Sequence, residues 1–135
     1  MTDNLETILA RLPDAKRSIL RGVAAVVKSE GEQAFTRPEK RPAPWAPLKR
    51  TGKPATLRGN PPVLMRSFRV GEPAGDSIRL EVDRPYAAAH QFGAPSRNLP
   101  ARPYLPFDSA GNLLPRLEPL ILSTVDRILT QLFKN

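Results

Sequence analysis

The chain has 135 residues, of which 40% are hydrophobic and 25% charged, and its formal net charge is +8 at pH 7. This length and balance predict one folded domain with a modest core, and they exclude a disordered chain and a large enclosed active site. The absence of cysteine excludes disulfides and thiolate metal sites. No apolar run approaches the roughly 20 residues that a membrane span needs, so we expect no membrane partner.

The N-terminal region, residues 1–35, predicts two amphipathic helices. Residues 3–12 place Leu5, Ile8, Leu9 and Leu12 on one helical face. Proline fixes φ and removes a backbone donor, so Pro13 should end or kink this helix. A second helix is then expected from Asp14 to Phe35, with one buried face.

Residues 36–62 predict a long irregular loop, because seven prolines in this segment exclude a regular helix or central strand. The loop is strongly basic, with seven cations against Glu39 alone between positions 37 and 58. Such charge can bind phosphate or an acidic protein ring, or it can simply keep the loop solvated. Trp45 is expected to anchor the loop on the core, with base stacking as the alternative. The basic residues are Arg37, Lys40, Arg41, Lys49, Arg50, Lys53 and Arg58.

The rest of the chain predicts a small α+β fold. Residues 63–83 alternate apolar and polar side chains on both sides of a Gly/Pro turn, which indicates a β-hairpin. Residues 84–113 should form a short helix closed by Gly93 and then an extended proline-rich arm. Residues 114–135 predict a helix that buries a continuous apolar stripe in the core. We therefore expect a short antiparallel sheet packed against N-terminal and C-terminal helices, with the basic loop and the arm projecting.

Catalysis is not expected from this composition. The chain has one histidine and no cysteine, and its carboxylates show neither paired nor Ca²⁺-loop spacing. No nucleophile or second base is placed by spacing to work with His90. The sequence predicts no enzyme, no cofactor and no metal site.

Two linked motifs stand in the second half of the chain. They are Tyr86-Ala87-Ala88-Ala89-His90-Gln91-Phe92-Gly93 and Pro100-Ala101-Arg102-Pro103-Tyr104-Leu105. With them the chain resembles the virion morphogenesis, or tail-completion, proteins of Mu-like and related tailed phages. Phe35, the run Pro44-Trp45-Ala46-Pro47-Leu48 and the run Leu64-Met65-Arg66-Ser67 are similar to further family elements. Pro61-Pro62 departs from the family's Thr-Gly pair, so the turn before residue 64 is expected to differ.

The resemblance implies a structural protein of the phage neck, which completes the tail or joins head to tail. It further implies a homo-oligomeric ring, contacts with other neck and tail proteins, assembly in the host cytoplasm, and contact with packaged DNA without sequence specificity. The alternative from a different class is a nucleic-acid-binding accessory protein that uses the basic loop. The motif residues expected at interfaces are Trp45, Tyr86, His90, Gln91, Phe92, Gly93, Arg102, Pro103 and Tyr104.

Overall fold

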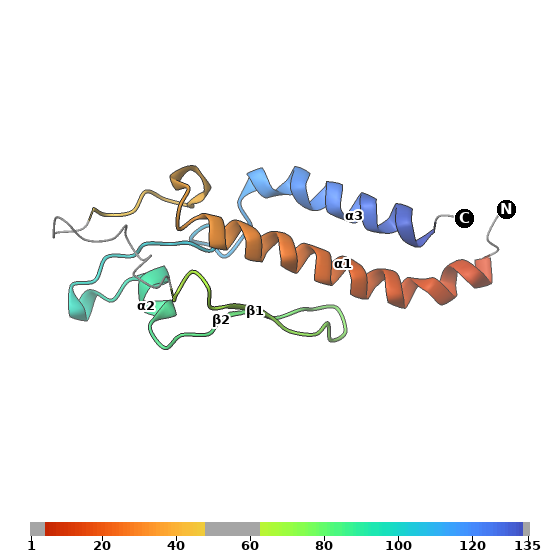
Figure 1. Ribbon diagram of the computed structural model, residues 1–135, viewed down its shortest axis with the longest axis horizontal. Coiled ribbons are helices and arrows are strands. Elements are labelled where there is room, and N and C mark those ends of the chain that lie inside the picture. Colours follow the sequence, from red (N-terminus) through yellow and green to blue (C-terminus); the bar gives the residue numbers. More distant parts are fainter. Residues whose placement is uncertain (1–4, 48–62, 134–135) are drawn as a thin grey trace.

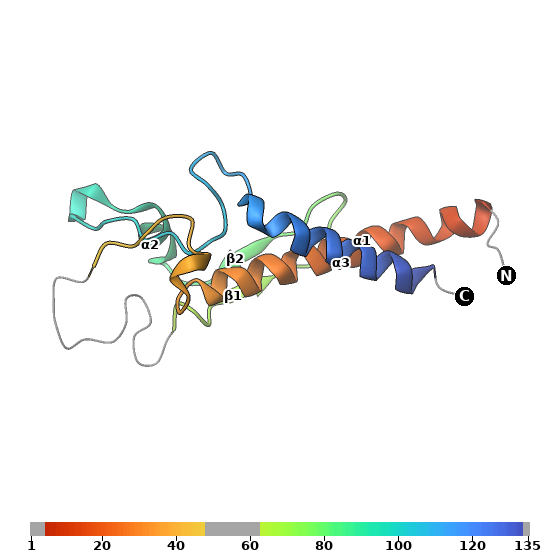
Figure 2. The same ribbon diagram turned by 90° about the horizontal axis from the view of Figure 1, so that it is seen from above.

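The computed structural model describes residues 5–47 and 63–133, which form the predicted α+β fold. Two long helices, α1 and α3, lie side by side and run in opposite directions, and the sheet lies across α1 from α3 (Figure 1). A quarter turn of the molecule shows an elongated shape, with both termini at the end formed by α1 and α3 and α2 at the opposite end (Figure 2). We call the end that contains α2 the lobe. The elements are α1 (Leu5–Gln33), η1 (Pro38–Lys40), β1 (Phe68–Val70), β2 (Leu80–Val82), α2 (Ala87–Phe92), η2 (Pro95–Arg97), η3 (Pro115–Leu117) and α3 (Glu118–Leu132).

The N-terminal region is one helix, so the prediction of two helices separated at Pro13 was wrong. Helix α1 contains Pro13 in its interior, and its N-terminal third bends relative to the remainder (Figure 1). A proline inside a helix removes one hydrogen bond and crowds the preceding turn, which bends a helix without always ending it. The apolar positions continue in phase on both sides of Pro13, so one helix serves both segments.

The predicted β-hairpin is confirmed, but its strands are shorter than the alternation indicated. β1 and β2 pair antiparallel, with Phe68 opposite Val82 and Val70 opposite Leu80. Residues 63–66 form a turn instead of strand. Ser67 holds this turn, because its hydroxyl donates to the Val63 carbonyl and its amide donates to Leu64 O at 3.1 Å.

The proline-rich arm is only partly a projection. Its second half runs through the protein interior, where Arg102, Tyr104 and Pro106 are buried at alternate positions. Alternation is the pattern of extended chain, and an extended segment can be core without pairing as a strand. The expectation of a wholly projecting arm was therefore wrong for residues 102–106.

Helix α3 is less buried than its apolar stripe predicted. Ile128 is buried, and Leu117 is buried in η3 just before the helix. In contrast, Leu120 and Leu129 are 44% and 37% exposed. The main neighbour of α3 is α1, so only the side of α3 that faces α1 is buried. The prediction of a fully buried stripe was wrong.

The core lies in the lobe, at the junction of α1, β1, α2 and the buried half of the arm. Phe35 packs against Tyr104 with ring centroids 5.0 Å apart, and Phe68 contacts both rings edge-on. Trp45 and Leu80 pack against this cluster from outside. Among the described residues, no helix is long and apolar enough to cross a membrane.

Candidate functional site

The two sequence motifs meet in the lobe, where Tyr104 is their centre. Its hydroxyl donates to the Ala87 carbonyl at 2.9 Å, so the second motif is tied to the first turn of α2. Tyr104 is 1% exposed, and burial raises its pKa to about 12. A phenol in this setting stays protonated and donates one hydrogen bond, which is a structural role.

Gln91 joins the motifs a second time. Its side-chain oxygen accepts hydrogen bonds from the backbone amides of Tyr104 and Leu105, at 2.9 and 3.0 Å. The amide of Arg102 donates to the His90 carbonyl at 2.7 Å. These bonds replace the ladder that a partner strand would have supplied, so the buried extended segment keeps its backbone groups satisfied.

Gly93 closes α2 at a point where a side chain would not fit. Its φ is +81°, and an added Cβ would lie 3.0 Å from the amide nitrogen of Ala101. Positive φ at close backbone approach is a glycine requirement. The sequence prediction of a glycine that closes the short helix is confirmed.

Arg102 and Trp45 fasten the start of the basic loop to the arm. The Arg102 side chain donates from Nε to Ala46 O at 3.0 Å and from a terminal nitrogen to Pro47 O at 3.3 Å. Trp45 donates from Nε1 to the Pro103 carbonyl at 2.7 Å. The predicted anchoring role of Trp45 is therefore confirmed. Arg102 and Pro103, expected at interfaces, are contacts within the lobe in this structure.

His90 faces the interior without a catalytic partner among the described residues. Its Nδ1 is buried and has no hydrogen-bond partner there. Burial, and then the positive charge of Arg102, lowers its pKa. The ring stands edge-on to Tyr86, with centroids 5.7 Å apart. The described residues also contain no group of three or more His, Cys, Asp or Glu that could hold a metal ion.

The aromatic residues of the motifs separate into two groups. Phe92 and Tyr86 are 76% and 42% exposed, whereas Tyr104 is core. Tyr104, which the sequence placed among the interface residues, is therefore a core residue in this structure. Of the aromatic residues of the two motifs, Phe92 and Tyr86 are the exposed ones.

The described cations of the basic loop are mostly engaged within the chain. Lys40 pairs with Glu30 at 2.7 Å. The Arg41 guanidinium lies 3.6 Å from the centre of the Trp45 ring and donates to Ala34 O at 2.6 Å. Arg37 is exposed. The other predicted contact residues, Lys49, Arg50, Lys53 and Arg58, lie outside the described residues.

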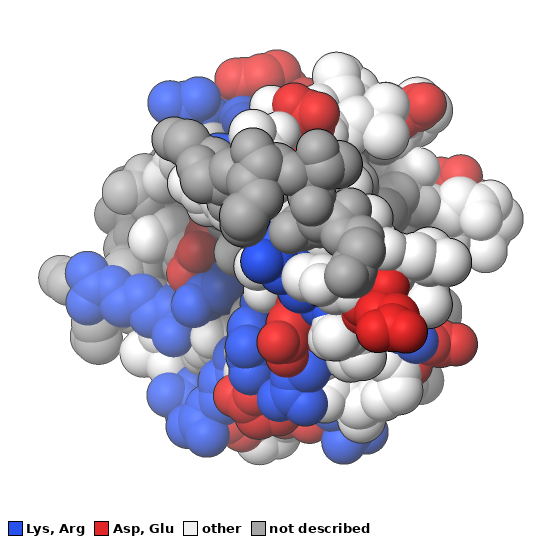
Figure 3. All heavy atoms as spheres, turned by 90° about the vertical axis from the view of Figure 1, so that its right-hand side faces the viewer, with Lys and Arg blue, Asp and Glu red and all other residues white. Residues whose placement is uncertain are grey.

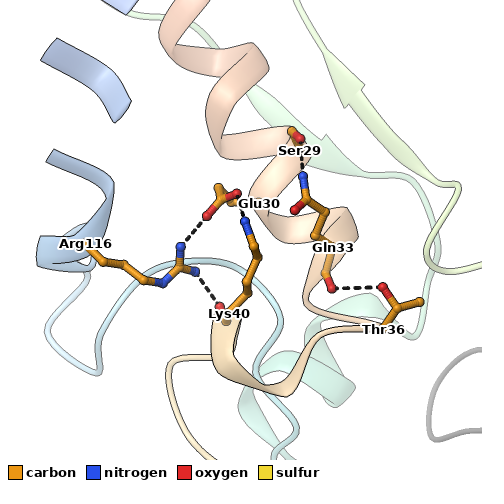
Figure 4. Close-up of polar contacts among 6 residues, drawn as sticks. All are labelled: Ser29, Glu30, Gln33, Thr36, Lys40 and Arg116. Atoms are coloured by element: carbon orange, nitrogen blue, oxygen red, sulfur yellow. Dashed lines mark hydrogen bonds and ion pairs between the residues drawn. The ribbon is translucent and has the colours of Figure 1, made fainter. Parts of the chain in front are cut away.

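Glu30 is a buried carboxylate that sequence reasoning missed. It lies between Lys40 and Arg116, and Arg116 also donates to the Lys40 carbonyl at 2.6 Å (Figure 4). Burial raises the pKa of Glu30, but hydrogen bonds and charge from both cations outweigh it and the net pKa is lowered. One signal was present, because Glu30 shares a helical face with Val27 and Val23 and is acidic where the pattern is apolar.

The model of the phage virion morphogenesis family matches residues 1–114, which include both motifs and the whole lobe core. No curated protein and no solved structure matches the chain. The match covers most of the chain and agrees with the motif resemblance. The protein therefore belongs to the phage virion morphogenesis family, and its role is structural, in the assembly of the phage particle.

Proposed function

We propose that the protein is a structural component of the phage neck, where it completes the tail or joins head to tail as one subunit of a ring. The observation that carries this proposal is the exposure of leucines on the antiparallel helix pair formed by α1 and α3. Leu5, Leu9 and Leu122 are 69, 53 and 58% exposed. Leu5 and Leu9 are exposed one helical turn apart on α1, and such a pair is suited to burial against a neighbour, as a virion assembly protein requires.

The shape of the molecule suits a ring subunit. The pair of helices α1 and α3 extends away from the lobe, and no other element covers the full length of the pair (Figures 1 and 2). Copies placed side by side can pack the helix pair of one copy against the helix pair of the next, and the lobes then lie together at one end. Head-to-tail contact of this kind closes into a ring when the rotation between copies divides a full circle.

The basic loop supplies charge that a neck protein can use. Lys40 and Arg41 are held by intramolecular contacts, so the charge offered to a partner comes from Arg37 and from the cations at 49, 50, 53 and 58. In a ring these charges would face packaged DNA or an acidic neighbouring ring. Attraction of this kind speeds encounter and requires no base contacts.

A complementation experiment tests the neck role. In a phage that lacks this gene product, we expect filled heads and free tails, counted by electron microscopy, and recovery of joined particles when the chain is supplied. A variant with Lys49, Arg50, Lys53 and Arg58 all changed to Glu should fold and fail to join. A single Lys49→Ala should be nearly silent, because an exposed ion pair contributes only about 0 to 1 kcal/mol.

Three results would count against the proposal. Empty heads, or absent tails, would place the protein at another assembly step. Normal titres with the four-fold variant would remove the electrostatic part. A purified chain that stays monomeric in native mass spectrometry and binds free DNA in a salt-dependent way would favour the nucleic-acid-binding alternative.

A further inference from the structure

A pocket lies in the lobe, between the start of the basic loop and the exposed half of the arm. Its volume is about 720 Å³, which is a usual size for a ligand pocket. Most of the described wall is apolar and rich in proline, and the polar side chains in it are those of Asn98 and Arg102. The apolar lining residues are Ala46, Pro47, Pro95, Leu99 and Pro100.

Arg102 brings a positive charge to this pocket without a carboxylate partner in the described part of the chain. The residue is 7% exposed, and its side chain donates from Nε to Ala46 O and from Nη2 to Pro47 O, at 3.0 and 3.3 Å. Both bonds use one edge of the guanidinium. The edge formed by Nη1 and the second hydrogen of Nη2 is left without a hydrogen bond. Because a buried cation without a counter-ion is unfavourable, this edge favours an anion.

The free edge of Arg102 can be reached from the pocket. Among the described side chains, the fully buried polar atom that lacks a hydrogen-bond partner is Nδ1 of His90. Nη1 of Arg102 also lacks a partner, so it is not fully buried, and the space beside Arg102 is the pocket. Asn98 lines the same pocket, and its side-chain amide can donate a further hydrogen bond to an anion.

The sequence around the pocket is free of negative charge. Residues 40–71 and 84–107 contain no Asp or Glu, and these two stretches supply all the described lining residues. At the opposite end of the molecule, in contrast, acidic side chains lie beside basic ones (Figure 3). The local charge therefore attracts a negative group to the pocket.

We propose that this pocket binds a segment of another virion protein in which an Asp or Glu side chain stands beside apolar residues. The carboxylate accepts two hydrogen bonds from the free edge of Arg102, in the geometry for which a guanidinium is suited. The apolar neighbours pack on Pro47, Leu99 and Pro100. A DNA backbone fits less well, because binding of nucleic acid uses several cations that follow the phosphates and the described lining contains one. The pocket belongs to a single chain, so its use does not depend on the ring.

A titration of the purified chain with short capped peptides tests the pocket. The probe is a peptide with one Glu flanked by leucine and proline, and the matched probe has Gln in place of Glu. The Glu peptide should shift the backbone amide signals of Leu99 and Arg102 in NMR spectra. The Gln peptide should bind at least about tenfold more weakly, because a neutral amide does not pair with the guanidinium charge.

Two variants of the arm provide the matched comparison. Asn98→Asp places a carboxylate in the pocket and should weaken binding of the Glu peptide at least about tenfold. Ser96→Asp adds the same charge at an exposed position that is not in the lining, and it should change binding less than about twofold. Both positions are exposed, so the melting temperatures should not change. Arg102 itself is kept, because its loss would also release the start of the basic loop.

A cross-link in assembled particles identifies the natural occupant. Pro100→p-benzoylphenylalanine should, on irradiation, join to a protein segment that contains Asp or Glu, and addition of Asn98→Asp should remove this cross-link. Equal binding of the Glu and Gln peptides overturns the inference. It is also overturned if neither peptide binds and the particles give no cross-link, or give one to a segment without Asp or Glu. Shifts of Leu99 and Arg102 with a DNA duplex, and none with the Glu peptide, would assign the pocket to nucleic acid and reject the proposal.

Discussion

The lobe and the helix pair of α1 and α3 use their side chains in opposite ways. In the lobe, Tyr104, Gln91 and Arg102 are at most 8% exposed and are hydrogen-bonded to backbone. On α3 and α1, in contrast, Leu122 and Leu5 are more than half exposed. The recognisable motifs therefore build the fold, whereas the assembly surface that we propose for the ring lies on helices with ordinary sequences.

The largest contrast is expected within α3. Ile128→Asp should unfold the protein, because an unpaired buried carboxylate costs about 3–5 kcal/mol, comparable to the stability of a small domain. Leu120→Asp, at a position 44% exposed, should change the free energy of unfolding by no more than about 1 kcal/mol. Urea denaturation followed by circular dichroism measures both. Equal losses for the two variants would show that α3 is buried on all sides.

The next contrast is between the two aromatic groups of the motifs. Tyr104→Ala should lower the free energy of unfolding by about 3–4 kcal/mol, because it empties the centre of the core and removes the hydroxyl bond to Ala87. Phe92→Ala should change it by less than about 0.5 kcal/mol, since Phe92 is 76% exposed. Thermal and urea unfolding of both variants checks this. A stable Tyr104→Ala protein would contradict the structural role of the second motif.

A smaller effect is expected at Glu30, which fastens the lobe to the start of α3. Glu30→Gln should cost about 2–3 kcal/mol, because the hydrogen bonds from Lys40 and Arg116 lose their charge. The folded-state pKa of Glu30 lies below 4.5, so its stabilisation is present above pH 4.5 and is lost as the pH falls through the folded-state value. Urea unfolding at neutral pH and below pH 4.5 should show a smaller acid-dependent loss in Glu30→Gln than in the native chain. Identical pH profiles would assign the acid sensitivity elsewhere.

Local pattern alone predicted the fold class, the antiparallel hairpin, the C-terminal helix and the closing glycine of α2. Helical and strand periods are set by backbone geometry, so apolar spacing carries them into the sequence. The anchoring role of Trp45 was also the preferred expectation, ahead of base stacking, because burial of a large ring against the core is favourable. The two motifs predicted the family, which the family comparison confirms.

Tertiary contacts decided the rest. Nothing local distinguishes Ile128 from Leu120, because both are apolar residues of one helix and only the position of α1 buries one of them. The burial of Arg102 and Tyr104 depends on Gln91, which satisfies their segment's backbone from another element. The pairing of Glu30 with Arg116 joins residues 86 positions apart. Periodicity states which residues can be buried, but the neighbour that buries them is chosen by long-range packing, and so the candidate assembly surface appeared only in the folded chain.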